Sequence, residues 1–164
     1  MDSQLHAHHG PGFPAGSQQR LRVAAAVVWR GDRLLMTQRP PGGPLGLSWE
    51  FPGGKIEEGE SPEHALVREI HEELGVEATP LELLAVETHD YPHGLEIEIA
   101  FIRCALASLD LERGSGIHDI QWWRLDEVDL GQVLAGDRGF LEQLGAKPAS
   151  HPDPPAGAPA GAPG

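Results

Sequence analysis

The sequence from Gly53 to Val76 reads GGKIEEGESPEHALVREIHEELGV and is the most informative part of the chain. Within it, Glu69, Glu72 and Glu73 stand at positions i, i+3 and i+4, which share one face of a helix. Three carboxylates so close together repel one another unless a cation lies between them. Hard divalent cations prefer carboxylate oxygens, so this spacing predicts a metal-binding helix face.

The ends of this helix are also marked in the sequence. Ser61 is a favourable N-cap, Pro62 suits the first helical position, and Gly75 can close the C-terminus in a left-handed turn. We therefore predict a helix from Pro62 to Leu74, with an apolar face beside the acidic one. Before the helix, the run 52–54 (PGG) predicts a turn whose backbone can approach a ligand closely.

A Glu-rich helix face can also be no more than a solvated surface. That alternative leaves the fixed offsets of Glu60, Arg68 and Gly75 unexplained. The stretch from Gly54 to Val76 resembles the Nudix box, G-x5-E-x7-R-E-U-x-E-E-x-G-U with U an aliphatic residue, and matches every specified position. The resemblance implies a Mg²⁺- or Mn²⁺-dependent hydrolase of nucleoside diphosphates linked to another group. It also implies an α/β/α sandwich in which the box forms a loop-helix-loop.

The resemblance further implies a role for each charged residue of the helix. Glu72 and Glu73 are the expected principal metal ligands, and the Gly54 carbonyl is an expected backbone ligand. Glu69 is expected to be either a ligand or the general base. Arg68 is expected to orient Glu69, so Arg68, Glu69 and Glu72 form the expected catalytic set.

The resemblance also implies two structural residues in the box and one further metal ligand in a later loop. Glu60 and Gly75 are expected to support the box structurally. Gly116 stands in the loop where MutT-like members of the family carry a glutamate that completes the metal site. Either Asp119 or His118 takes that place, or the site works without it, and we assign Asp119 as the expected ligand.

Within the family the chain is most similar to the MutT-type nucleoside triphosphate pyrophosphohydrolases, from about Leu21 to Leu144. In these enzymes the position of Asp137 holds a side chain that reads the base edge, and a carboxylate suits that task. The alternative for Asp137 is an N-cap of the last helix. The positions of Phe51 and Arg39 are expected to help bind the base and the phosphate or sugar.

The net charge of the chain indicates which kind of ligand it can bind. The net charge of −13 lies within residues 21–145, whereas duplex nucleic acid attracts basic proteins. A polymeric nucleic acid is therefore disfavoured, and a small nucleotide complexed with metal is favoured. Lys55, one of two lysines in the chain, is expected to meet a phosphate, with a plain surface charge as the alternative.

Composition predicts one domain with dissimilar ends. Residues 1–20 and 146–164 are rich in Gly, Pro, Ala and Ser and are predicted to be disordered tails around a domain at 21–145. No apolar run resembles a secretory signal or a membrane span, so we expect a cytoplasmic protein without a membrane partner. It is expected to be a monomer or a homodimer.

Apolar runs and turn residues predict the order of the elements. Strands are expected at 21–30, 33–39, 81–90, 95–106 and 120–124, with the first two in a hairpin and a final helix at about 138–144. Together with the box helix, these elements predict an α/β (α+β) domain built on a mixed sheet.

The favoured function is Mg²⁺-dependent hydrolysis of a nucleoside triphosphate to monophosphate and pyrophosphate. An oxidised or otherwise abnormal deoxynucleotide such as 8-oxo-dGTP, or a CTP-like nucleotide, is the expected substrate, which suggests nucleotide-pool sanitation and DNA repair. One alternative is a Nudix hydrolase for ADP-ribose, a dinucleoside polyphosphate or NADH. The other is a non-catalytic nucleotide-binding module, against which the intact Glu69, Glu72 and Glu73 argue.

Overall fold

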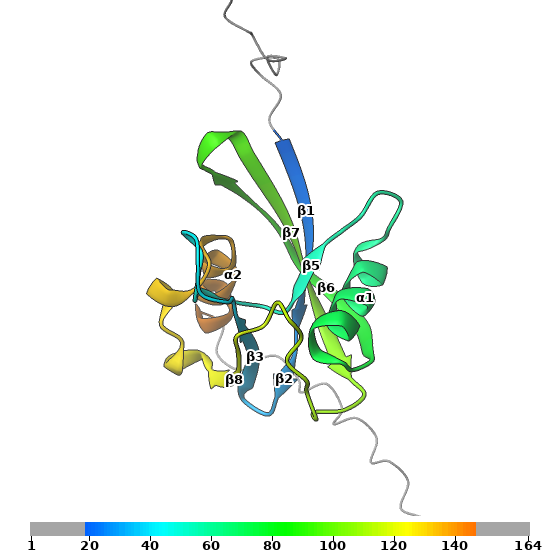
Figure 1. Ribbon diagram of the computed structural model, residues 1–164. Helices are drawn as coiled ribbons and strands as arrows, with labels where there is room; N and C mark the ends of the chain where they lie inside the picture. The colour runs from blue at the N-terminus through cyan, green and yellow to red at the C-terminus, as the bar shows by residue number, and fades with distance from the viewer. Residues whose placement is uncertain (1–18, 147–164) are drawn as a thin grey trace, which may run out of the picture.

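The computed structural model describes residues 19–146. The tails expected at 1–20 and 146–164 therefore lie outside the described residues, except for residues 19 and 20, which belong to β1, and residue 146, which ends α2. Two helices, α1 (Pro62–Leu74) and α2 (Ala135–Ala146), lie on opposite sides of the strands (Figure 1). This is the α/β/α arrangement predicted from the sequence. Between residues 19 and 146, no helix is long and apolar enough to cross a membrane.

The first sheet positions the box and has the strand order β5-β1-β7-β6. Its strands are β1 (Gln19–Val27), β5 (Gly53–Lys55), β6 (Ala78–Tyr91) and β7 (Leu95–Leu106). β1 runs parallel to β7 and antiparallel to β5, and β6 runs antiparallel to β7. The sheet is therefore mixed, as predicted.

The second sheet is built around β3, which pairs antiparallel with each of its neighbours. Its strands are β2 (Trp29–Arg30), β3 (Arg33–Gln38), β4 (Trp49–Glu50) and β8 (Asp119–Arg124). Short 3₁₀ helices lie at η1 (Pro92–Gly94), η2 (Leu125–Glu127) and η3 (Leu130–Gln132).

The N-terminal strands differ from the prediction. β1 starts at Gln19 because Arg20 pairs with Glu96 of β7, and their side chains form an ion pair of 3.0 Å. The expected hairpin involves only the two residues of β2, since the strand is interrupted at Val28, where the chain passes from the first sheet to the second. The last helix also starts earlier than expected, at Ala135.

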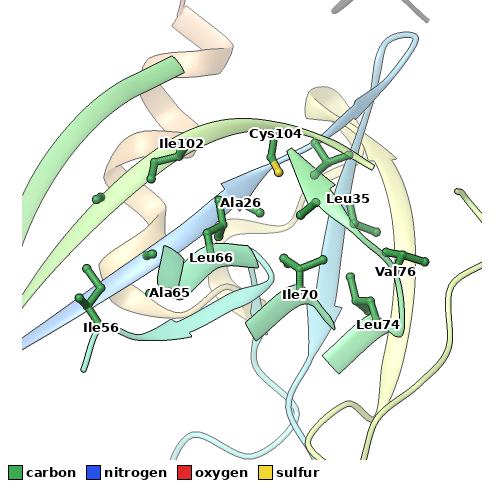
Figure 2. Close-up of a cluster of buried hydrophobic side chains, with 14 residues drawn as sticks. Ala26, Leu35, Ile56, Ala65, Leu66, Ile70, Leu74, Val76, Ile102 and Cys104 are labelled. Carbon is green, nitrogen blue, oxygen red and sulfur yellow. The ribbon is translucent and has the colours of Figure 1, made fainter. Parts of the chain in front are cut away.

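Side chains of β1 alternate between two hydrophobic clusters, one under each helix. Ala24 and Ala26 belong to the α1-side cluster, whereas Ala25 and Val27 belong to the α2-side cluster. Figure 2 shows the α1-side cluster, to which the helix contributes its apolar residues: Ala65, Leu66, Ile70 and Leu74. Burial of this face fixes the rotation of α1 and leaves its glutamates beside β5.

The ends of α1 are those predicted. The Ser61 hydroxyl accepts the His64 N–H at 3.1 Å, which satisfies one of the free donors of the first turn. Gly75 closes the helix with φ 69°, and its N–H donates to the His71 carbonyl at 3.0 Å.

Candidate functional site

Arg68 connects the segments of the box. Its Nε and Nη2 atoms each lie 2.9 Å from a carboxylate oxygen of Glu60, which makes a two-point ion pair. Its Nη1 donates to Glu69 Oε1 at 2.9 Å, and Nη2 also donates to the Lys55 carbonyl at 3.0 Å. The hydrogen bonds that Arg68 donates to the Glu60 carboxylate, helped by the Glu57 N–H, lower the pKa of Glu60 to about 2. Arg68 therefore contacts both Glu60 and Glu69, and the roles expected of these residues stay predictions.

The glycine turn lies directly against Glu69. Gly54 pairs with Ala24 in the first sheet, and a β-carbon on Gly54 would lie 2.6 Å from Glu69 Oε2. Gly53 has φ 148°, and a β-carbon there would collide with the Ala24 carbonyl oxygen. Gly53 cannot be replaced without backbone strain, whereas a side chain at Gly54 would have to displace the Glu69 carboxylate, so the turn presents bare backbone to that carboxylate.

Glu73 occupies an unfavourable place for a carboxylate. Its Oε2 accepts the Gly53 N–H at 3.3 Å. Burial, together with the charges of Glu69, Glu50 and Glu72, raises the pKa of Glu73 to about 8, although the Gly53 hydrogen bond acts in the opposite direction. The metal-free fold thus holds an excess of negative charge here. Glu72 is the most open of the three box glutamates, with its Oε2 3.7 Å from Arg68 Nη1.

The chemistry of these residues fits a hard divalent cation. Within residues 19–146, no three His, Cys, Asp or Glu side chains already converge on one point as metal ligands do. Nevertheless, Glu69 and Glu73 both reach the glycine turn, one at Gly54 and one at Gly53. Carboxylate and carbonyl oxygens with surplus charge are what Mg²⁺ prefers.

Asp119 makes its own hydrogen bonds at the start of β8. It begins β8 opposite Gln38, and its carboxylate accepts the Ile120 N–H at 2.8 Å and the Gln121 side chain at 3.3 Å. Among the hydrogen bonds of the described chain, none joins Asp119 to the box glutamates. Its assignment as a metal ligand stays a prediction.

The loop before β8 brings a different acid to the box helix. The Glu112 N–H donates to the Leu74 carbonyl at 2.9 Å, and the Gly114 N–H donates to the Glu73 carbonyl at 2.8 Å. The Glu112 carboxylate lies beside Gly75, where a β-carbon would be 2.8 Å from its Oε2. The loop therefore covers the C-terminal end of α1.

Asp137 connects α2 to the strand that leads into the box. It is buried, and its Oδ2 accepts the Phe51 N–H at 3.0 Å. Burial raises the pKa of Asp137 to about 8. Because α2 starts at Ala135, Asp137 lies inside the first turn, and the N-cap alternative is wrong.

The chain has the sequence pattern of a known family. The NUDIX domain profile matches residues 19–144. The chain belongs to this family. Its Nudix box is the Gly54–Val76 segment described above, and the resemblance inferred from the sequence is confirmed.

Two curated Nudix relatives carry names that concern nucleotides. The 8-oxo-dGTP diphosphatase of Proteus vulgaris is 42% identical over 76 residues, which cover 46% of this chain and 68% of that protein. The CTP pyrophosphohydrolase of Escherichia coli strain K12 is 48% identical over 65 residues, or 40% of this chain and 48% of that protein. The second match thus spans about half of the relative's own length.

A solved structure covers more of the chain. The solution structure of the E. coli ORF135 protein is 32% identical, with a TM-score of 0.70 over 85% of this chain and 99% of that one. The likeness extends over nearly the whole of that protein, so the predicted fold class is confirmed.

Of the residues expected to bind substrate in this Nudix protein, Phe51 is buried and Lys55 is exposed. The Phe51 ring is buried between Phe101 and Phe140, with ring centroids 5.5 and 5.7 Å away, so its backbone N–H is what meets Asp137. The Lys55 side chain is exposed while its carbonyl holds Arg68 in place.

Glu50 is a site residue that the sequence reasoning missed. Burial raises its pKa, while Arg39, whose Nη1 lies 3.4 Å from Glu50 Oε1, lowers it. The Glu50 charge in turn raises the pKa of both Glu73 and Asp137. The charge of Glu50 therefore acts both on a glutamate of the Nudix box and on Asp137. The available signal was an acidic residue between Trp49 and Phe51 in an otherwise apolar run.

Proposed function

We propose that this Nudix hydrolase converts a nucleoside triphosphate into a nucleoside monophosphate and pyrophosphate, with Mg²⁺ or Mn²⁺ as cofactor. The proposed substrate is an oxidised or otherwise abnormal deoxynucleotide, or a CTP-like nucleotide. The names of the two curated relatives support this substrate class. Removal of such nucleotides from the pool is the role that this activity would serve.

The main observation behind the proposal is that Glu69 is held by Arg68 on one side and lies against Gly54 on the other. Glu69 is held by a charge-assisted hydrogen bond of 2.9 Å, and its carboxylate touches the bare backbone of the glycine turn. A carboxylate fixed in this way is prepared for chemistry, because little reorganisation is needed when the substrate arrives.

The metal ligands proposed are the side chains of Glu72 and Glu73 and the carbonyl of Gly54. Bound Mg²⁺ would neutralise phosphate oxygens and acidify the attacking water. In the reaction the water oxygen bonds to phosphorus and the anhydride bridge between the α- and β-phosphates breaks. The proton of the water passes to a carboxylate of the site, and Glu69 is the one that we propose as general base. Arg68 keeps Glu69 aimed at that proton.

The base end of the substrate is proposed to meet Asp137. With its pKa near 8, Asp137 is mostly protonated at neutral pH, so its carboxyl can donate a hydrogen bond while Oδ2 accepts from Phe51. A buried donor of this kind discriminates between base edges, since a mismatched edge leaves it unpaired. Arg39 beside Glu50 and exposed Lys55 are proposed contacts for phosphate or sugar.

A panel of nucleotides tests the proposal. With Mg²⁺ present, normal and 8-oxo-purine triphosphates, CTP, ADP-ribose, a dinucleoside polyphosphate and NADH would each be assayed separately for pyrophosphate and orthophosphate. We expect monophosphate and pyrophosphate from at least one triphosphate. Release of orthophosphate alone, or activity confined to ADP-ribose, would overturn the proposed function, and binding without any product would point to a nucleotide-binding module.

A further inference from the structure

The N-terminal turn of α2 is held from two separate strands. The Leu134 N–H donates to the Trp49 carbonyl of β4 at 2.8 Å. On the other side, the Gly136 N–H donates to the hydroxyl of Tyr91, the last residue of β6, at 3.1 Å. The next residue is Asp137, whose carboxylate accepts a hydrogen bond from the Phe51 N–H. The N-terminal end of α2, which carries Asp137, is therefore positioned by hydrogen bonds to residues of other elements.

The Tyr91 hydroxyl satisfies a donor that the helix itself cannot satisfy. The first N–H groups of a helix have no intrahelical partner, and Gly136 is buried. A β-carbon on Gly136 would lie 2.9 Å from Ile99 Cδ1 and 3.2 Å from the Tyr91 hydroxyl oxygen. Glycine thus allows α2 to approach the first sheet closely enough for this bond. The Tyr91 ring is itself steadied by an edge contact with His89, at 4.6 Å between centroids.

We propose that Tyr91 is a positioning residue for base selection, acting through Asp137. The inference rests on the proposed function, because it takes Asp137 to be the group that meets the base. Removal of the hydroxyl leaves the Gly136 N–H without a partner at a buried site. The first turn of α2 then loses its link to β6, and the adjacent Asp137 is less well fixed against Phe51. Selectivity between bases should fall while the Nudix box is untouched.

The test variant is Tyr91→Phe in the full chain, since it removes one oxygen and keeps the ring packed on His89. Thr88→Val is the matched control, because it removes a hydroxyl from the same strand at an exposed position. We expect Tyr91→Phe to raise KM for the preferred triphosphate by about tenfold with kcat within about twofold. Poorly used triphosphates should be unaffected, so the selectivity ratio narrows, and Thr88→Val should match the wild type.

A double-mutant cycle tests whether Tyr91 acts through its proposed partner. In an Asp137→Asn background, Tyr91→Phe should cause no further loss of selectivity, because both changes remove the same effect. Amide hydrogen exchange supplies a readout independent of activity. Exchange at Gly136 and at Phe51 should become faster in Tyr91→Phe and stay unchanged in Thr88→Val.

Several results would overturn the inference. One is an equal loss of activity toward every triphosphate, which indicates a purely structural role. Another is full additivity with Asp137→Asn, and a third is unchanged exchange at Phe51. Failure of the proposed function is recognised separately, from the wild type alone, as an absence of pyrophosphate from any triphosphate. In that case the exchange at Phe51 still decides whether Tyr91 positions Asp137.

Discussion

Gly54 and Glu69 are in direct contact: a β-carbon on Gly54 would lie 2.6 Å from Glu69 Oε2. The residues belong to different elements, β5 and α1, so this contact joins the glycine turn to the acidic face of the box helix. The absence of a side chain at 54 leaves room for the Glu69 carboxylate beside the turn, where the proposed metal site lies.

Gly54→Ala is therefore expected to displace Glu69 and lower kcat by about 10- to 100-fold, the usual cost of disturbing the support of a metal ligand. Steady-state kinetics with Mg²⁺ measures this effect. Gly145→Ala is the matched control, since a β-carbon there meets nothing within 4 Å. Equal turnover in the two variants would contradict the role given to the turn.

Arg68→Lys should lower kcat/KM by about 10- to 100-fold although the charge is kept. Lysine cannot reproduce the forked contact with Glu60 together with the bond to Glu69. Arg33→Lys makes the same chemical change in the exposed ion pair with Glu127 and should have little effect. The assignment fails if the two variants have the same kcat/KM.

Glu69→Gln is expected to lower kcat by about 10²- to 10⁴-fold, since the amide can neither accept the proton of the water nor neutralise a cation. Glu58→Gln, at an exposed position in the loop before α1, serves as the control for loss of one negative charge. Turnover near the wild-type value in Glu69→Gln would refute the role of this residue.

The metal-free protein should lose stability as the pH rises from about 5 to 8. Glu73 and Asp137 have a pKa of about 8 in the fold, against ordinary values of 4.5 and 3.8. Between these values the folded chain binds more protons than the unfolded chain. Their contribution is therefore complete below the ordinary values and is lost as the pH rises through about 8. Urea unfolding in EDTA measures the slope, which Glu73→Gln and Asp137→Asn should each flatten.

Mg²⁺ should reverse this loss in a pH-dependent way. Ligand carboxylates must be deprotonated to bind metal, so millimolar Mg²⁺ should raise the melting temperature more at pH 8 than at pH 6. Glu72→Gln should reduce the shift, and Glu58→Gln should leave it intact. A wild-type protein with no shift at either pH would argue against a shared metal site.

Local signals in the sequence were enough to predict the box helix. Ser61 and Gly75 determine its ends through contacts within a few residues, and both caps were found as expected. Such features need no knowledge of distant strands. The contact of Arg68 with Glu69 agrees with the family resemblance, whereas the ion pair of Arg68 with Glu60 was not predicted.

Features that depend on distant strands were predicted less well. The interruption at Val28 exists because β1 pairs with β5 and β7 while β2 pairs with β3, and no local signal distinguishes these partners. The start of α2 depends on a contact with β4, in which the Leu134 N–H donates to the Trp49 carbonyl. Asp119 was assigned from loop position alone, and the structure gives it partners only within β8.

The central place of β1 in the first sheet has a consequence for the order of folding. Its parallel partner β7 lies far along the chain, as the 76-residue separation of Arg22 and Glu98 shows. Contacts this distant in sequence form slowly, because a long loop must close first. On the ribosome, the pairing of β1 with β7 must therefore wait until β7, which ends at Leu106, has been synthesised. A nascent chain that stops after Val76 already contains the whole Nudix box but lacks β7, the parallel neighbour of the strand that pairs with the glycine turn.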